Sequence, residues 1–136
     1  MYVFEILDEV RKARSKTKKV DILKGHNDNW ALKDIIRGSM DSTVKWSIPD
    51  GEPPYTPSEP HNHPSDLKRQ NTKFAFLVQG MYKDTPRFKK EKIYFEILEG
   101  IHPEDAKLVI AMINKQTPKG LTRPVVNEAY PGLLQD

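Results

Sequence analysis

Apolar residues in the first third of the chain recur at the spacing of amphipathic helices. The first set comprises Val3, Ile6, Leu7 and Val10. Its i, i+3, i+4, i+7 spacing predicts a helix that begins almost at residue 1. Ser15 can cap a second helix that Gly25 would end, and Asn27 or Asp28 can cap a third with Trp30 near its start. The inward residues would be Val20 and Leu23 in the second helix, and Leu32, Ile35, Ile36 and Met40 in the third.

Two more helices are expected between residues 65 and 100. Ser65 or Asp66 can cap the first helix. Thr85 can cap the second, with Pro86 as its first helical residue, a position that tolerates proline. The second would run toward Gly100. The apolar residues are Leu67, Phe74, Leu77, Val78 and Met81 in the first helix, and Phe88, Ile93, Phe95, Ile97 and Leu98 in the second.

The last two helices are predicted from proline and acidic start patterns. Pro103 followed by two acidic residues opens one of them, with Leu108, Ile110, Met112 and Ile113 on its apolar side. Thr122, Arg123 and Pro124 open a final short helix through Ala129, which Pro131 and Gly132 would end.

The segment between the two groups of helices lacks helical periodicity. Residues 43–48 suit extended structure or a loose turn, and six of the eleven prolines fall within residues 49–64. Because proline interrupts both helices and strands, residues 48–65 should form one long irregular loop. We therefore predict an all-α protein, a compact bundle of about six or seven short helices in a single domain over residues 1–136.

Composition restricts the chemistry. The strong core formers Leu, Ile, Val and Phe make up 33 of the 136 residues, which is enough for a globular core. The chain has no cysteine, which excludes disulfides and thiol catalysis. No apolar run approaches 18 residues, so we expect neither a membrane span nor a signal peptide, and a location in the cytoplasm.

Charge is nearly balanced but unevenly placed. Lys and Arg number 22 against 19 Asp and Glu, and many of the cations gather in three runs. The runs are Arg11, Lys12, Arg14, Lys16, Lys18 and Lys19; Arg87, Lys89, Lys90 and Lys92; and Lys115, Lys119 and Arg123. Such runs can bind phosphate, although any single run is more often a solvated helix face. Residues 116–123 join two predicted helices through Gly120 and Thr122, which suits either an ordinary connection or a turn that approaches a nucleic-acid strand.

Other candidate chemistry is weaker. His61 and His63 could bind a metal, but no third ligand stands at a motif spacing, so we expect no metal and no cofactor. Trp30 and Trp46 could stack on bases, although tryptophans of small helical domains usually lie in the core. No catalytic motif stands out, and Gly38 and Gly120 lack the Gly-Lys-Ser/Thr ending of a phosphate-binding loop.

Taken in order, several segments resemble the N-terminal DNA-binding domain of ATP-dependent DNA ligases, most closely those of tailed phages. The segments are residues 3–10, 15–24, 27–33, the Gly120-Leu-Thr122 step and residues 126–134, which end in Pro-Gly-Leu-Leu. The resemblance covers nearly the whole chain and departs from the family in residues 49–64. It implies a helical module on the minor-groove side of duplex DNA that reads backbone and shape.

Position by position, the resemblance implies that the turn Lys119-Gly120-Leu121-Thr122 contacts DNA, with Arg123 beside it. Lys18 and Lys19 are further candidates, and the basic runs add Lys115, Arg87, Lys89 and Lys90. Ligase chemistry needs a lysine in Lys-x-Asp-Gly. The single Asp-Gly step is Asp50-Gly51, and Ile48 occupies the lysine position. No nucleotide-binding domain follows Asp136, so we expect a non-enzyme, either free-standing or a fragment.

These observations lead to two functional hypotheses. The first is a monomeric, non-catalytic protein that binds double-stranded DNA, either intact or nicked, independently of sequence. It would be encoded by a phage and act on replication or repair intermediates in the cytoplasm of an infected cell. The second is a protein-interaction adaptor in a phage replication or host-takeover complex, favoured by the proline-rich loop and the near balance of charge. An enzyme with an unfamiliar site is the least supported reading.

Overall fold

The computed structural model describes residues 1–49 and 51–136. These residues contain seven α-helices and one 3-10 helix, and no β-sheet, which confirms the predicted all-α class. The helices are α1 (Val3–Lys12), α2 (Lys16–Gly25), α3 (Trp30–Met40), α4 (Leu67–Gln70), the 3-10 helix η1 (Asn71–Leu77), α5 (Arg87–Gly100), α6 (Pro103–Ile113) and α7 (Arg123–Ala129).

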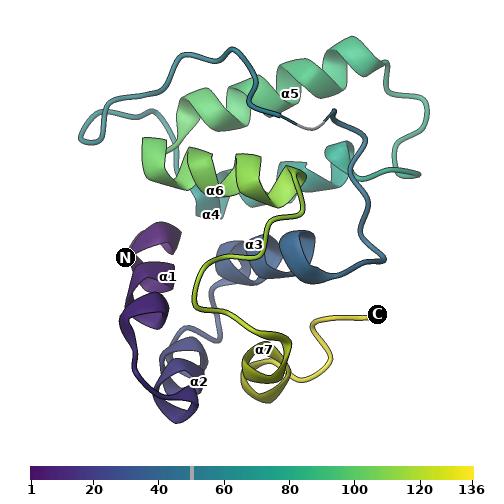
Figure 1. The fold of residues 1–136 in the computed structure, drawn as a ribbon. Helices are drawn as coiled ribbons and strands as arrows, with labels where there is room; N and C mark the ends of the chain where they lie inside the picture. The colour runs from purple at the N-terminus through teal and green to yellow at the C-terminus, as the bar shows by residue number, and fades with distance from the viewer. Residues whose placement is uncertain (50) are drawn as a thin grey trace.

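The helices form two groups with α3 between them (Figure 1). At one end of the molecule, α2 packs against α1 and α7. At the other end, α5 packs against α6 and η1. Because α3 packs on α6 and α1 also contacts α6, one continuous core joins the two ends.

Most of the apolar residues predicted from the sequence form this core, but Phe88 and Met81, predicted on helix faces, are exposed. Its largest fully buried side chains are Ile6, Leu23, Leu32, Ile35, Ile36, Leu67, Leu77, Ile97, Leu98, Ile101, Met112 and Ile113. Burial of a side chain of this size contributes about 1.5–3 kcal/mol to folding. The predicted helix faces at residues 3–10, 20–23 and 32–40 therefore point inward as expected.

Two predicted helix starts are wrong by one or two residues. The N-cap of α3 is Asn29 instead of Asn27 or Asp28, and its side-chain oxygen accepts from Leu32 N at 3.1 Å. Pro86 is the N-cap of α5 instead of the first helical residue, and Thr85 lies outside the helix. Ser15 and Thr122 cap α2 and α7 as predicted.

The helix predicted over residues 65–81 is shorter than expected. Asp66 caps α4, and the chain then tightens into η1, which ends at Leu77. Val78 is extended and pairs with Trp46, while Ser47 N donates to Leu77 O at 2.8 Å. Backbone groups that a longer helix would have paired internally thus pair with the segment over residues 43–48 instead.

The proline-rich segment is irregular, as predicted, and lies beside α5 (Figure 1). Thr56 N donates to the Glu99 carboxylate at 2.8 Å, and Ser65 N donates to Gly100 O at 2.7 Å. Asp50, in the Asp-Gly step considered above, lies outside the described residues. None of the helices described over residues 1–49 and 51–136 has the length and apolarity to cross a membrane.

Candidate nucleic-acid interface

Positive charge is concentrated at the α1–α2 end of the molecule. Residues 8–24 contain seven Lys or Arg and three Asp or Glu, a net charge of +4, while the whole chain carries +3. The first turn of α2 contains no acidic residue, and Lys16, Lys18 and Lys19 stand there instead. The partial positive charge of a helix N-terminus adds to that of these side chains. The excess positive charge of the chain therefore lies in this segment.

The turn over residues 117–122 packs against this segment. Lys19 Nζ donates to Gly120 O at 2.8 Å, although the two residues are 101 positions apart. Gly120 has φ +90°, and a Cβ atom built on it would lie 2.6 Å from Arg11 Cα. The structure therefore brings the first basic run, within residues 11–19, next to the turn over residues 117–122, which contains Lys119 of the third run. We call these two segments the basic surface.

Three cations of the basic surface are exposed and unengaged. Within residues 1–49 and 51–136, no hydrogen bond or ion pair involves the side chains of Arg14, Lys18 and Lys119. Lys16 pairs with Glu128 at 3.3 Å, but both side chains are more than half exposed. Exposed pairs of this kind contribute about 0–1 kcal/mol, so a phosphate could displace Glu128. Arg14 and Lys16 belong to the first basic run but were not predicted contacts.

The backbone of the turn offers donors as well. Leu121 is buried, and its N–H donates to Pro118 O at 3.2 Å. In the part of the chain that the structure describes, the N–H groups of Lys119 and Gly120 have no acceptor. The Thr122 hydroxyl accepts from Val125 N at 3.5 Å and so caps α7. Cations beside unpaired amides are the usual partners of phosphate oxygens.

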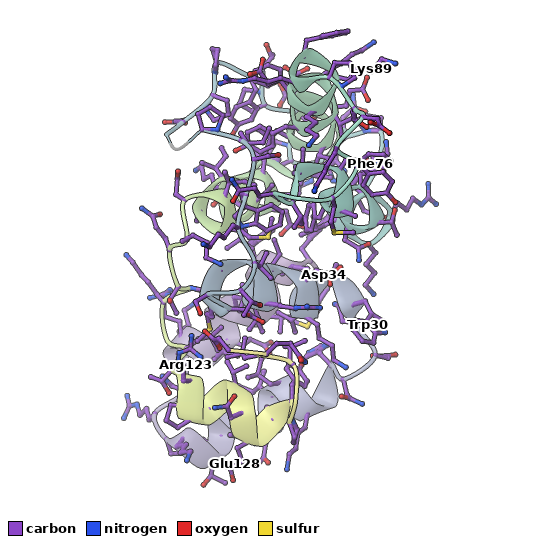
Figure 2. All side chains as sticks on the ribbon, turned by 90° about the vertical axis from the view of Figure 1, so that its right-hand side faces the viewer. Trp30, Asp34, Phe76, Lys89, Arg123 and Glu128 are labelled. Atoms are coloured by element: carbon purple, nitrogen blue, oxygen red, sulfur yellow. The ribbon has the colours of Figure 1, made fainter. Side chains whose placement is uncertain are left out.

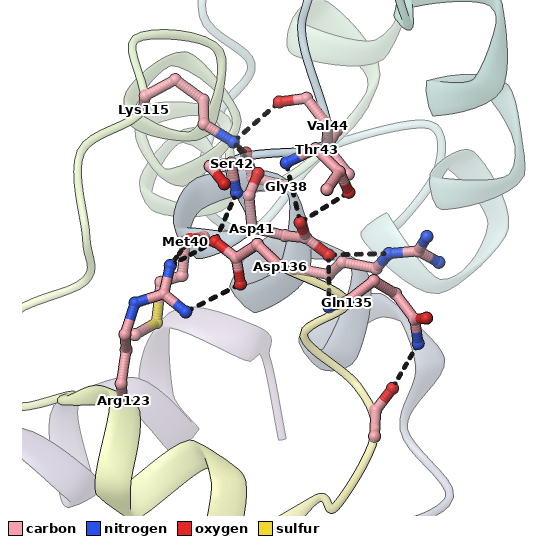
Figure 3. Close-up of polar contacts among 12 residues, drawn as sticks. Gly38, Met40, Asp41, Ser42, Thr43, Val44, Lys115, Arg123, Gln135 and Asp136 are labelled. Carbon is pink, nitrogen blue, oxygen red and sulfur yellow. Dashed lines mark hydrogen bonds and ion pairs between the residues drawn. The ribbon is translucent and has the colours of Figure 1, made fainter.

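Lys115 does not belong to the basic surface. Its Nζ donates to three backbone carbonyls, Gly38 O at 2.8 Å, Asp41 O at 2.7 Å and Val44 O at 2.9 Å (Figure 3). Burial lowers the pKa of this lysine. The prediction that Lys115 contacts DNA is therefore not supported, because its ammonium group satisfies carbonyls at and after the end of α3.

Arg123 is also engaged within the protein. Its guanidinium donates to both carboxylate oxygens of Asp136 at 2.8 and 2.6 Å and to Met40 O at 2.7 Å (Figure 3). The hydrogen bonds from Arg123 hold the pKa of the Asp136 carboxyl well below its ordinary value. Arg123 holds the C-terminal segment against α3, and we do not retain it as a DNA contact.

The remaining predicted contacts lie far from the basic surface. Arg87, Lys89 and Lys90 belong to the start of α5, at the opposite end of the molecule from α2 and α7 (Figures 1 and 2). Arg87 pairs with Glu91 at 3.2 Å, and Lys90 Nζ lies 3.5 Å from Met81 O. The second basic run is thus separated from the basic surface by the core of the molecule.

Two of the four histidines, His63 and His102, form an aromatic cluster with Tyr2 and Phe4 at the start of α1. His63 Nδ1 bonds to Ser65 O at 2.7 Å and Nε2 to the Tyr2 hydroxyl at 3.1 Å. His102 Nδ1 accepts from Glu104 N at 3.0 Å and caps α6. These bonds occupy both nitrogens of His63 and one nitrogen of His102. No group of three or more metal-ligating side chains occurs in the described residues.

Comparison with known proteins identifies the family to which the chain belongs. A family of unknown function, DUF6433, matches residues 6–119 of the chain. The chain belongs to this family. The DUF6433 match extends from α1 to Lys119, so it includes Lys18, Lys19 and Lys119 and stops before Thr122. No match was found among curated proteins.

Proposed function

We propose that this DUF6433 protein is a non-catalytic protein that binds double-stranded DNA through the basic surface, independently of base sequence. The observation that carries the proposal is the contact between Lys19 and Gly120, which joins the two basic segments. Arg14, Lys18 and Lys119 are exposed residues of these two segments, and within residues 1–49 and 51–136 their side chains make no hydrogen bond or ion pair. The resemblance of the same turn to the ligase DNA-binding domain supports duplex DNA as the ligand.

The chemistry of the basic surface favours phosphate over base edges. Two of the three unengaged cations are lysines, which contact phosphate as point charges. Contacts to phosphates fix the position of a protein on DNA without reading its sequence. We therefore propose similar affinity for unrelated duplexes, and replication or repair intermediates of a phage in the infected cell as the natural ligands.

A matched pair of double variants tests this proposal. We expect Lys18→Glu with Lys119→Glu to weaken duplex binding at least tenfold on two unrelated sequences, because two phosphate contacts become repulsive. Lys89→Glu with Lys90→Glu makes the same charge change at the opposite end and should leave affinity nearly unchanged. Fluorescence anisotropy with labelled 20-base-pair duplexes measures both. Equal losses in the two variants would contradict the assignment of the basic surface.

An exposed aromatic group favours a second candidate function, protein interaction. Met81 and Tyr82, in the connection before α5, and Phe88, in its first turn, are all exposed. Phe76 stacks on Tyr82 with 4.2 Å between ring centroids. Exposed apolar groups of this kind mark partner surfaces. This site is at the opposite end from the basic surface (Figure 1). A partner that is retained after nuclease treatment and lost with Phe88→Ala would support this adaptor function.

A further inference from the structure

Trp30 is exposed, contrary to the expectation that it lies in the core. It is the first residue of α3, directly after the N-cap Asn29, and 61% of its surface is accessible. Trp46 differs, because it is partly buried and its indole N–H donates to Gly38 O at 3.0 Å. An indole ring at the surface has a large apolar area that the fold does not use.

A groove with two cations lies beside Trp30. It has a volume of about 360 Å³ and runs between α3 and the segment that follows α7. Lys33 Nζ lies 4.5 Å from the Trp30 ring centroid and 5.0 Å from that of Tyr130. Arg37 also lines the groove, with Nε 3.7 Å from the Asp41 carboxylate and its two terminal nitrogens unpaired within the described residues. The groove therefore combines an aromatic ring with positive charge.

We infer that this groove binds one unpaired nucleotide of single-stranded DNA. The base would take the place of the Lys33 ammonium over the Trp30 ring and stack there. The displaced Lys33 and Arg37 would then pair with the adjacent phosphates. Proteins that bind single strands without sequence preference combine aromatic rings with cations in this way. The inference rests on the proposed function for DNA as the ligand, and extends it to DNA with an unpaired stretch next to a duplex.

The groove is separate from the basic surface. Trp30 and Arg123 lie on opposite sides of the molecule in Figure 2. Helix α7 begins at Arg123, next to the 117–122 turn, and ends at Ala129, next to Tyr130 in the groove. Seven helical residues span about 10 Å, so a DNA with a duplex and a single-stranded part could reach both sites. Bases within a duplex are paired and stacked, so intact duplex should not engage Trp30.

Tryptophan fluorescence tests this inference directly. We expect oligo-dT to quench the emission of the wild-type protein, and to quench it far less in Trp30→Phe, where Trp46 is the remaining tryptophan. Trp30→Ala should lower the affinity for oligo-dT about tenfold or more, because the base loses its stacking partner. Phe88→Ala removes a similarly exposed ring at the other end of the molecule and should leave this affinity unchanged.

The outcomes separate this inference from the proposed function. Binding of intact duplex by the wild-type protein, measured by anisotropy, tests the proposed function alone. If duplex binds but oligo-dT neither quenches Trp30 nor loses affinity in Trp30→Ala, the groove assignment is overturned and the proposed function stands. Quenching that persists unchanged in Trp30→Phe would also overturn it. Loss of oligo-dT affinity in Trp30→Ala with unchanged duplex affinity supports the groove as a site separate from the one that binds duplex.

Discussion

At Gly120 the backbone has φ +90° and approaches Arg11 so closely that a Cβ atom would lie 2.6 Å from Arg11 Cα. Both features require glycine, for separate reasons: a left-handed backbone, and contact between two segments distant in sequence. The glycine that the sequence suggested as a point of approach to DNA therefore has a structural role first. It lets the 117–122 turn join the α1–α2 segment and so forms the basic surface.

A series of glycine substitutions separates the two requirements. Gly25 is the last residue of α2, and no atom lies within 4 Å of a Cβ built on it. Gly25→Ala should therefore change the free energy of unfolding by less than about 1 kcal/mol. Gly132→Ala, with φ +82° and open space, should cost about 1–2 kcal/mol. Gly120→Ala should cost more than either, because a clash with backbone adds to the strain. Urea denaturation measures all three, and equal stabilities of Gly120→Ala and Gly132→Ala would contradict the close contact.

Asp105 is a buried acid that couples stability to pH. It is 1% exposed in the first turn of α6, and its carboxylate accepts from Phe4 N at 2.9 Å. Burial raises the pKa of Asp105 to about 6, from an ordinary value of 3.8. The folded protein thus holds this proton more tightly than the unfolded chain does. The contribution of Asp105 to the stability of the protein is therefore greatest below about pH 4, and it is lost as the pH rises through 6.

Asp105→Asn removes this titration and keeps an oxygen for Phe4 N. We expect the variant to gain stability relative to the wild type between pH 4 and pH 7, by up to about 3 kcal/mol, because the wild type alone must ionise a buried carboxyl. Urea denaturation at pH 4, 5, 6 and 7 measures the difference. A difference that stays constant over this range would show that the carboxyl titrates at its ordinary pKa.

At the scale of elements, the end of α3 is the main polar junction of the fold. Lys115 and Arg123 donate to its carbonyls, and Asp41 is fully buried beside them. Burial by itself would raise the pKa of Asp41, but hydrogen bonds from Thr43 and Gln135 lower it below its ordinary value. Two cations expected to contact DNA thus link α3 to the segments around them (Figure 3).

Lys115→Met should destabilise the protein by about 1–3 kcal/mol. The substitution leaves the carbonyls of Gly38, Asp41 and Val44 without their donor while it keeps most of the apolar stem. Lys119→Met is the matched control, because Lys119 is exposed and should change stability by no more than about 0.5 kcal/mol. Thermal denaturation distinguishes the two. If both variants melt like the wild type, Lys115 does not cap α3.

The helices themselves were largely predictable from sequence, and their ends were not. The apolar spacing of Val3 to Val10 is a local property, and α1 follows it. Residues 27–29 offer three cap-forming side chains in a row, so spacing alone could not select Asn29. Apolar spacing also predicts that Met81 lies in a helix, but Val78 pairs with Trp46, and this long-range contact ends η1 at Leu77.

At the scale of the whole molecule, the candidate site was only partly predictable. Sequence placed cations in runs, but which runs meet depends on tertiary contacts such as that of Lys19 with Gly120. Nothing near Lys115 in the sequence shows that carbonyls of Gly38 and Val44 surround its ammonium group. The exposure of Trp30 was unexpected for a related reason. The sequence shows that Trp30 lies near the start of a helix, but not whether other segments cover its side chain.

Phosphate contacts made by the basic surface carry the proposed function, and the salt dependence of duplex binding measures those contacts most directly. With Arg14, Lys18 and Lys119 each neutralising one phosphate, the logarithm of the association constant should fall with the logarithm of salt concentration at a slope of about −3, or steeper if Lys16 and Lys19 also engage. Lys18→Gln with Lys119→Gln should reduce the slope by about 2, whereas Lys89→Gln with Lys90→Gln should leave it unchanged. A slope near zero in the wild type, or the same slope in both double variants, would contradict the account.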